Sequence, residues 1–518
     1  MAVLSARNEA GWALRWVIVV IVATFATRLV LAATVGLGID EAYTVATARA
    51  WALGTFDHPP LAWWLAGGAA RLFGSENPLA VRAPFIVLFA LATWLAFDAG
   101  RALYGPRAGL FAAVTINLAP VLGWTSGSMV LPDGPLNAAM RATLCCLARA
   151  LFGDERRAPL WWIAAGICTG IACLAKLHGV LLLAGTGLFL LTSAPHRRWM
   201  LRPWPYLAAL VALAVASPFL IWNWQHDWVS FAFQAGRAKA TKLDVVGPLL
   251  ALGGQALFLL PWVWTALVIA LLRAVVNGPR ASRDWLLFCL AIGPIGIFTL
   301  VAITGTKVLF HWAAPGYLMA CVLLGRDVAR DLAAGDRTTR WWLRGSAASV
   351  TVLLVAVTAM ARLPWPAWTL PGGKDAPYPL IETQSWNELR GALAARGLLG
   401  RANTFVAGLR WHEAARIDVA LAQAMPVRCL CTDARGYGVI YDNRALLGQD
   451  AIIVTPDGVG DATAALLPYF ASVASLPPVT IKHAGQPMQV LRVMLAKGLR
   501  DPGLPTPNLL ELSGTMRR

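Results

Sequence analysis

The sequence predicts an all-α polytopic membrane protein of about 11 transmembrane helices plus interfacial helices, followed by a C-terminal extracytoplasmic α/β domain. Hydrophobic residues make up 58% of the chain, charged residues only 14%, and the mean hydropathy is +0.60. A soluble domain with this balance could not cover its surface with polar side chains, so most of the chain should lie in lipid. Many of the 24 Trp residues stand near the ends of apolar runs, as interfacial aromatic belts do.

The apolar runs of about 15–25 residues are long enough to cross the hydrocarbon core of a bilayer. They cover residues 16–35, 84–100, 108–125, 136–152, 160–175, 179–193, 204–222, 247–272, 285–303, 312–325 and 345–361. The short runs at 160–175 and 179–193 could instead be re-entrant or tilted. The first run is followed by acidic Asp40 rather than by a small-residue cleavage site, so we expect it to be retained as the first span.

The orientation follows from the basic residues between the spans. Seventeen Arg residues fall on one side of the predicted membrane, and eight Lys or Arg residues fall on the other. Because the cytoplasmic side carries the excess of positive charge, the N-terminus should lie inside and the C-terminus outside. The net charge of +17 is therefore spread over short loops, and this distribution argues against a nucleic-acid-binding groove.

Beyond about residue 361 the pattern changes, which divides the chain into a transmembrane domain, 1–361, and an extracytoplasmic α/β domain, 362–518. A linker rich in Pro and Gly precedes alternating strand and helix patterns. The expected strands are Thr404–Leu409, Val427–Cys431, Ala451–Thr455 and Val490–Leu495, and the expected helix is Glu413–Ala424. Cys429 and Cys431 share one face of a predicted strand, and either two free thiols or a labile disulfide would fit their spacing.

Acidic residues recur where apolar runs end, at Asp40 and Glu41, at Asp57, and at Asp133. Charge is costly at the edge of a bilayer, and on the predicted topology all of these carboxylates lie on the outer face, which indicates a site there. Three of these acids also have a purely structural interpretation. Asp40 and Glu41 would suit an N-cap and the first turn of a helix, and Asp133 would suit the N-cap of the fourth span.

Two segments of the first outer loop, Glu41–Gly54 and Pro60–Leu72, have the composition of amphipathic helices that lie in the interface plane. Helices of this kind could hold the head group of a substrate against the membrane while its tail stays in lipid.

Basic residues on the outer face complement the acids. They are Arg237, Lys239 and Lys242 in one loop, Lys176 with His178 in a tight turn, and Lys307 with His311 beside the tenth span. Positive charge on the disfavoured side suits an anionic ligand such as phosphate, although such side chains also extend toward lipid head groups. Arg141 lies inside the fourth span, where it could pair with Asp133 or with a neighbouring helix.

Taken together, these motifs resemble the bacterial branch of the GT-C glycosyltransferases, which is similar to the protein O-mannosyltransferases and the aminoarabinose transferases. The motifs are Asp40-Glu41-Ala42-Tyr43, Asp57-His58-Pro59-Pro60-Leu61, Pro132-Asp133-Gly134-Pro135-Leu136, Ala175-Lys176, the run Ser217–Trp228 with Phe231 and Gln234, and His311-Trp312 before Pro315. The resemblance covers roughly residues 16–325. His58 stands where the aminoarabinose enzymes carry Lys, so the resemblance does not extend to their particular sugar or to lipid A as the acceptor.

The resemblance implies an inner-membrane enzyme that uses a polyprenyl-phosphate-linked sugar donor and a lipid, glycan or protein acceptor. It makes Asp40 the catalytic carboxylate and matches Asp133 to a second acid, and Glu41 would orient Asp40 or a metal. A donor that carries its own phosphate leaving group needs no nucleotide pocket, and the chain has no Gly-rich phosphate loop. Lys176, Arg237, Lys239, Lys242 and His58 are candidates to neutralise the departing phosphate, and Asp57, Tyr43, His178, Lys307 and His311 are candidates to bind substrate.

The use of a divalent metal stays open at this point, as do the sugar and the acceptor. The alternative function is a transporter or flippase of lipid-linked saccharides, which would also have many spans and outer charges. Transporters, however, often show paired repeats and polar residues near the bilayer midplane. This chain shows no repeat and has few charges at the midplane.

Overall fold

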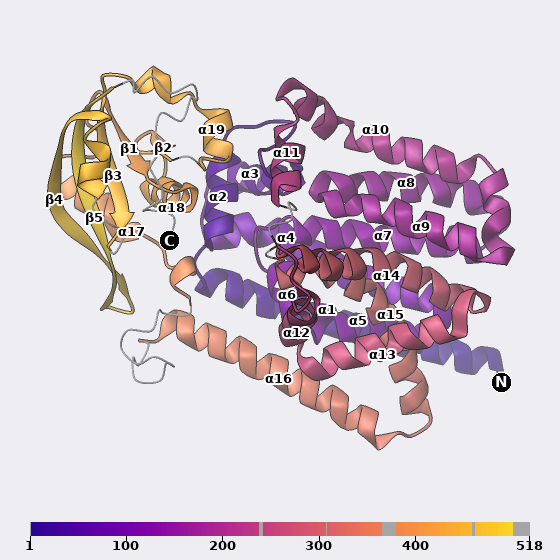
Figure 1. The fold of residues 1–518 in the computed structure, drawn as a ribbon. Coiled ribbons are helices and arrows are strands. Elements are labelled where there is room, and N and C mark those ends of the chain that lie inside the picture. The colour runs from indigo at the N-terminus through magenta and orange to yellow at the C-terminus, as the bar shows by residue number, and fades with distance from the viewer. Residues whose placement is uncertain are drawn as a thin grey trace. The chain divides into compact units, whose positions relative to one another are not determined.

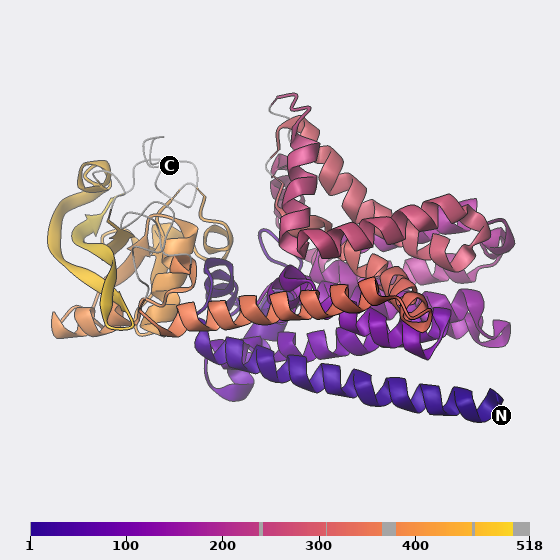
Figure 2. The same cartoon turned by 90° about the horizontal axis from the view of Figure 1, so that it is seen from below.

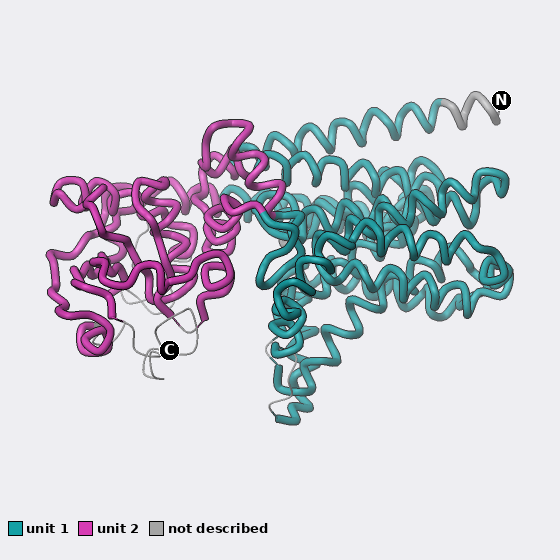
Figure 3. The backbone as a smooth tube through the Cα atoms, turned by 90° about the horizontal axis from the view of Figure 1, so that it is seen from above, with its two compact units in different colours: residues 1–31, 52–62, 82–355 teal, residues 32–51, 63–81, 356–518 magenta. Residues whose placement is uncertain are grey.

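The computed structural model describes residues 2–237, 242–306, 308–364, 380–431, 433–457 and 462–500. The chain forms two compact units, coloured separately in Figure 3. Unit 1 comprises residues 1–31, 52–62 and 82–355, and unit 2 comprises residues 32–51, 63–81 and 356–518.

Unit 1 is helical (Figure 1). Its helices, in chain order, are α1 (Ala2–Thr34), α4 (Pro78–Tyr104), α5 (Pro106–Asn117), α6 (Pro120–Thr125), α7 (Asp133–Phe152), α8 (Ala158–Ala175), α9 (Val180–Thr192), α10 (Trp204–Gln225), α11 (Val229–Arg237), α12 (Gly247–Leu259), α13 (Pro261–Asn277), α14 (Ser282–Leu300), α15 (Ala314–Ala333) and α16 (Arg337–Arg362). The end of α1, the start of α4 and the last residues of α16 belong to unit 2. Figure 2 shows α1, in indigo, as one long helix.

Seven helices of the described chain are long and apolar enough to cross a membrane, or eight if the bent pair 177–192 and 194–201 forms one span. The predicted number of about 11 is therefore not confirmed. The predicted run 108–125 is divided between α5 and α6, and the run 247–272 breaks at Leu260, where φ is +68°, just before Pro261. A proline removes a helix donor and disfavours helical backbone in the residue before it, which accounts for such breaks. The run 160–175 is a complete candidate span rather than a re-entrant segment, whereas 179–193 enters the bent pair.

Two further predicted spans, 136–152 and 312–325, form helices α7 and α15, but these helices are not among the seven that are long and apolar enough to cross a membrane. Both helices are largely buried within unit 1 and carry internal charges, such as Arg141 in α7 and Asp327 in α15. A helix that is enclosed by other helices can satisfy polar side chains internally, so its hydropathy falls below that of a lipid-facing helix.

One end of unit 1 is rich in ion pairs. Arg326 pairs with Asp284 and Asp327, Arg273 donates to Asp327 over 2.9 Å, and the Tyr104 hydroxyl donates to Asp284 over 2.7 Å. These contacts join the ends of α4, α13, α14 and α15. Arg273 and Arg326 thus meet at the same end of the bundle.

Unit 2 is an α/β assembly that includes α2 (Ile39–Thr47) and, from Trp63 onward, α3 (Leu61–Phe73), which are helices of the first loop. Its other helices are α17 (Asn387–Ala395), α18 (Trp411–Leu421), α19 (Gly436–Ile440) and α20 (Ala462–Leu466). Its strands are β1 (Thr404–Gly408), β2 (Val427–Cys429), β3 (Asp450–Pro456), β4 (Phe470–His483) and β5 (Gln486–Leu499), in the order β2-β1-β3-β5-β4 (Figure 1). β1 pairs in parallel with β2 and β3, and β5 pairs antiparallel with β3 and β4.

The predicted strands and helix of the C-terminal region are confirmed as β1, β2, β3, β5 and α18, with ends shifted by a few residues. β4 was not predicted. It carries Pro477 and Pro478, which mark an irregularity in its pairing with β5, and it lies at the edge of the sheet. The predicted loop helix Glu41–Gly54 is shorter than expected, ending at Thr47, and residues 41–47 are all buried in unit 2.

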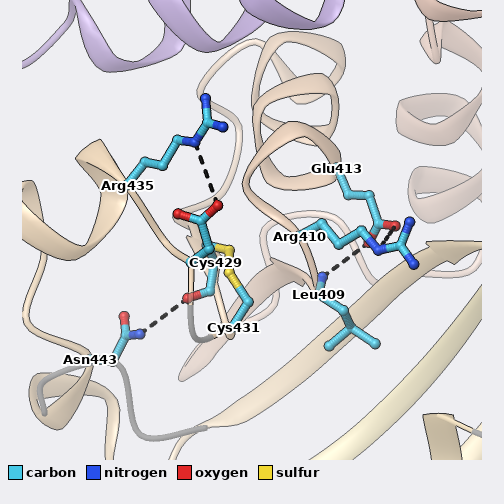
Figure 4. The surroundings of a disulfide bond; sticks show 8 residues. Leu409, Arg410, Glu413, Cys429, Cys431, Arg435 and Asn443 are labelled. Carbon is cyan, nitrogen blue, oxygen red and sulfur yellow. Dashed lines mark hydrogen bonds and ion pairs between the residues drawn. A yellow bond between two sulfur atoms is a disulfide. The ribbon is translucent and has the colours of Figure 1, made fainter. Parts of the chain in front are cut away.

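Cys429 and Cys431 form a disulfide at the end of β2, with Cα atoms 5.6 Å apart (Figure 4). The alternative of two free thiols is therefore excluded in this structure. Both cysteines are buried, and the Asn443 amide donates to the Cys429 carbonyl over 3.4 Å. Disulfides are typical of oxidising compartments rather than of the cytoplasm.

Candidate active site

A buried ion pair lies at the centre of the polar residues of unit 1. Asp133 is the first residue of α7, after an N-cap at Pro132, and Lys176 caps the C-terminal end of α8. The Lys176 ammonium donates to both carboxylate oxygens of Asp133 over 3.1 Å. Asp133 is only 4% exposed and Lys176 5%. A buried pair of this kind is maintained only when both partners stay in place, because either charge alone would be strongly disfavoured.

Two histidines stand beside this pair. His178 follows Lys176 in a short 3-10 helix (Leu177–Gly179), and its ring stacks on Phe298 with centroids 4.5 Å apart. His58, Asp133, Lys176 and His311 all lie within electrostatic range of His178. The Nε2 atom of His178 is buried and has no hydrogen-bond partner among the described residues. A buried polar atom without a partner is unusual and points to a group that binds there.

His311 lies in another short 3-10 helix, Phe310–Ala313, which precedes α15. Burial lowers the pKa of His311 to about 4, although Asp133 opposes this shift. His311 is therefore neutral at neutral pH and can act as a hydrogen-bond donor or acceptor.

Arg237 is the last residue of α11, and its guanidinium lies over the ring of Trp312 at 4.8 Å from the centroid. It also lies within electrostatic range of His311. The same helix anchors the first loop, because Ser230 donates to the Thr55 carbonyl over 2.6 Å and Gln234 donates to the Asp57 carbonyl. Asp57 is buried. Thus the Asp57–His58 motif, Asp133, Lys176, His178, His311 and Arg237 all belong to the polar part of unit 1.

Three other residues were predicted to bind the phosphate or the substrate, and the structure describes one of them. Lys239 and Lys307 lie outside the described residues, and Lys242 is exposed, with its backbone N–H donating to the Thr304 carbonyl over 3.4 Å.

Asp40, Glu41 and Tyr43 belong to unit 2, on helix α2. Gly38 is the N-cap of this helix and Glu41 its third residue, and the Glu41 carboxylate accepts a hydrogen bond from the Gly38 backbone over 2.8 Å. Glu41 thus fills the structural role of a first-turn acid, whereas Asp40 is the second residue and is exposed rather than an N-cap. Asp133, likewise, is the first residue of its helix and not the N-cap that the sequence suggested.

Tyr43 points into unit 2 rather than toward solvent. Its hydroxyl accepts a hydrogen bond from the Gly436 backbone over 2.9 Å, and its ring packs edge-on against Trp411 at 5.2 Å. The helix that carries Asp40 is therefore held by the C-terminal α/β residues.

Arg49 strengthens this attachment and was not singled out from the sequence. It donates to both carboxylate oxygens of Glu76, over 2.7 and 2.6 Å, and it pairs with Asp418 of α18, which also accepts from the Tyr437 hydroxyl over 3.1 Å. These partners are 27 and 369 residues from Arg49 in the chain, and no local pattern signals such contacts.

Helix α7 carries two further polar side chains after Asp133: Asn137, one helical turn later, and Arg141, two turns later. The Asn137 amide donates to the Ser126 hydroxyl over 2.5 Å, while no donor among the described residues reaches its Oδ1 atom. Arg141 does not pair with Asp133, contrary to one of the two predicted options. Among the described residues, the Arg141 guanidinium makes one hydrogen bond, from Nη1 to the Asn137 carbonyl over 3.4 Å, and its Nε and Nη2 atoms are buried without a hydrogen-bond partner.

Within the described ranges, no three His, Cys, Asp or Glu side chains come together in a way that could hold a metal ion.

Part of the chain is similar in sequence to known proteins. Residues 57–222 match the model of the dolichyl-phosphate-mannose-protein mannosyltransferase family. This segment contains the Asp57–His58 motif, Asp133, Lys176 and His178. A lipid A galacturonosyltransferase, RgtD of Rhizobium johnstonii, is 25% identical over 309 residues, which cover 55% of this chain and 59% of that protein. The chain thus matches about three-fifths of the length of this relative.

Solved structures extend the likeness to the whole fold. ArnT from Cupriavidus metallidurans in the apo state matches with a TM-score of 0.64 over 93% of this chain and 98% of that chain, at 15% identity. The same protein bound to undecaprenyl phosphate matches with a TM-score of 0.61 over 97% and 99%, at 16% identity. At these identities the comparison shows a shared fold. Together with the family match over residues 57–222, it supports the resemblance predicted from the motifs: the chain has the fold of ArnT and several helices that are apolar enough to cross a membrane.

Proposed function

We propose that the protein is an integral membrane glycosyltransferase that moves a sugar from a polyprenyl-phosphate-linked donor to a hydroxyl acceptor. The reaction takes place on the outer face of the bacterial inner membrane. The matched family and the relatives are glycosyltransferases by name, and ArnT has been captured with undecaprenyl phosphate, which is a polyprenyl phosphate.

The observation that carries the proposal is the buried Asp133–Lys176 pair beside His178, whose Nε2 atom has no partner among the described residues. A lipid-borne phosphate would accept hydrogen bonds from Lys176, from His178 and from Arg237 at the edge of the cluster. His58 and His311 would complete the polar wall around the phosphate, and Asp57 and Asp133 would bind the sugar or the acceptor.

The chemistry is a single displacement. The acceptor oxygen attacks the anomeric carbon, the bond between that carbon and the phosphate oxygen breaks, and the phosphate leaves with the electron pair. The acceptor hydroxyl is a poor nucleophile until a base removes its proton, and we assign this role to Asp40, whose position in the second residue of α2 leaves it exposed. Glu41 and Tyr43 position α2, while Lys176 and its neighbours stabilise the departing phosphate. One displacement inverts the configuration at the anomeric carbon.

The assignment of the outer face rests on two features. The Cys429–Cys431 disulfide favours an oxidising compartment for unit 2. The cluster of Arg273, Arg283 and Arg326 at one end of unit 1 favours the cytoplasm for that end, because cytoplasmic loops carry the excess of Arg and Lys.

The first test compares envelope glycolipids and glycans, by mass spectrometry, between cells with and without the gene. A glycosyltransferase predicts the loss of one sugar-bearing species on deletion and its return on complementation. The purified protein in liposomes, given a polyprenyl-phosphate sugar and the deleted strain's lipid extract, should then form the same species.

A flippase would give a different result. It would move a labelled lipid-linked sugar across the liposome membrane without forming a new glycosidic bond. Observation of translocation alone, with no product in the extract, would refute the proposed function.

A further inference from the structure

A separate cavity of about 530 Å³ lies within unit 2. It is lined by the last turn of α1, the last turn of α16, the loop between α3 and α4, the segment 380–387 and α18, together with Ala42 of α2 and His483 of β4. None of the residues to which the proposed reaction assigns a role lines it. We propose that this cavity is a binding site for the anionic head group of a membrane lipid, which carries a phosphate or a carboxylate.

The position of the cavity relative to the membrane spans is the first argument. Ala33 and Thr34 end α1, and Ala361 is the next-to-last residue of α16, and both helices are candidate spans. The Arg362 guanidinium donates to the Ala33 carbonyl over 3.2 Å, so the two helix ends are joined directly. Where spans end, a bilayer presents its head groups, and the cavity opens beside that level.

The charge of Arg416 is the second argument. Arg416 is a residue of α18 that lines the cavity, and it has no carboxylate within ion-pairing distance in the part of the chain that the structure describes. The other charged residue on the cavity wall, Glu76, has both carboxylate oxygens engaged by Arg49. Glu382 and Glu413 lie within electrostatic range of Arg416 but do not form an ion pair with it, so the wall presents a guanidinium whose charge is only partly balanced. Burial lowers the pKa of Arg416 only to about 10, so the charge persists at neutral pH.

The guanidinium is held in one orientation. Its Nη2 atom donates to the carbonyls of Ile381 and Gln384, over 3.1 and 2.8 Å, and its plane lies over the ring of Trp386 at 4.2 Å from the centroid. Nη1 makes no hydrogen bond within the described residues and is accessible. A fixed guanidinium with an open donor edge is the arrangement that proteins use to bind phosphate and carboxylate groups.

The rest of the wall suits a lipid rather than a free ion. Val35, Leu37, Leu380 and Val419 supply apolar surface next to the charged and hydroxyl-bearing residues. This wall is also tied to the end of α16, because His483 contacts the carbonyls of Met360 and Leu363 over 3.0 and 3.1 Å and the Gln384 side chain over 3.1 Å. The head group would meet Arg416 while the first carbons of its chains follow this apolar surface.

Native mass spectrometry of the full-length protein in detergent tests the proposal. The probes are phosphatidylglycerol, phosphatidylcholine with the same acyl chains, and inorganic phosphate as a competitor. We expect the occupancy of phosphatidylglycerol to exceed that of phosphatidylcholine, and Arg416→Gln to weaken phosphatidylglycerol binding by about tenfold or more, which corresponds to loss of one charge-assisted hydrogen bond. Arg390→Gln, an equal change at an exposed arginine of the neighbouring α17, should bind as the wild type does.

Three outcomes would overturn the proposal. They are equal binding by the Arg416→Gln and Arg390→Gln variants, equal binding of both lipids by the wild type, and complete competition by inorganic phosphate at the concentration of the lipid. The last outcome would identify a site for small anions. Circular dichroism and size exclusion show whether Arg416→Gln folds. If it does not fold, the second variant is Ala361→Trp, in which a large ring on the cavity wall should lower the occupancy of phosphatidylglycerol. Unchanged occupancy in Ala361→Trp would refute the site. None of these measurements depends on sugar transfer, so their failure would leave the proposed function untouched.

Discussion

Replacement of Lys176 by methionine removes the charged end of this side chain and keeps most of its length and apolar volume. In the structure the Lys176 ammonium contacts both oxygens of Asp133 over 3.1 Å, and both residues are about 95% buried. The variant would leave the Asp133 carboxylate in the protein interior without its cation.

Loss of one partner from a buried ion pair costs about 3–5 kcal/mol, because the remaining charge has neither water nor a counter-ion. The Asp133–Lys176 pair is buried well enough for this range to apply, although His178 and His311 stand nearby and would recover part of the loss. We therefore expect Lys176→Met to lower the free energy of unfolding by about 3 kcal/mol, near the lower end of the range.

The measurement is an SDS titration of the purified protein in mixed micelles. Lys482→Met, at an exposed lysine, is the matched control and should change stability by less than about 0.5 kcal/mol. The double variant Asp133→Leu with Lys176→Met should recover most of the stability, because it removes both charges. It should nevertheless transfer no sugar, since both groups are assigned to the reaction. The reasoning would be refuted if Lys176→Met were as stable as the wild type and equally active.

Three further predictions concern unit 2. Asp418→Asn weakens the ion pair with Arg49, so amide hydrogen exchange in residues 39–47 should become faster than in the wild type, while the β-sheet stays protected. Unchanged exchange in α2 would argue against the Arg49–Asp418 contact as an anchor. Tyr43→Phe leaves the Gly436 N–H without its acceptor and should cost about 1–3 kcal/mol, which the same SDS titration would register; Tyr206→Phe, at an exposed tyrosine, is the control. Burial raises the pKa of Glu413 to about 7 from 4.5, so its contribution to stability is complete below about pH 4.5 and is lost as the pH rises through 7. The melting temperature of the wild type should consequently fall relative to Glu413→Gln between pH 5 and pH 8, and parallel melting curves across that interval would contradict the assignment.

The sequence was informative where local pattern determines structure. Short apolar runs identified β1 and β3, which are buried on both faces. Long apolar runs identified helices such as α1 and α14. They identified α7 and α15 as helices too, but the predicted number of spans is not confirmed, because enclosed helices and broken pairs cannot be told from lipid-facing spans by composition alone.

The candidate site was only partly predictable, for a physical reason. Each of the residues Asp133, Lys176, His178 and His311 was chosen for its charge and its place at the end of an apolar run. That Lys176 pairs with Asp133, 43 residues earlier, follows from the packing of α7 against α8, which no short motif encodes. The role of Arg49 in holding the first loop was missed for the same reason, as its partner Asp418 lies in the distant C-terminal region.

The central claim is that Asp40 acts as the base in sugar transfer, and the rate of transfer by purified Asp40→Asn measures it most directly. The assay uses a polyprenyl-phosphate sugar and the acceptor identified in the envelope, with Asp227→Asn as the control. Asp227 is an exposed acid in a left-handed backbone conformation, with φ at +52°, which asparagine tolerates equally well. Loss of a general base predicts a rate lower by about 10²–10⁴-fold with donor binding unchanged. A wild-type rate for Asp40→Asn would contradict the account.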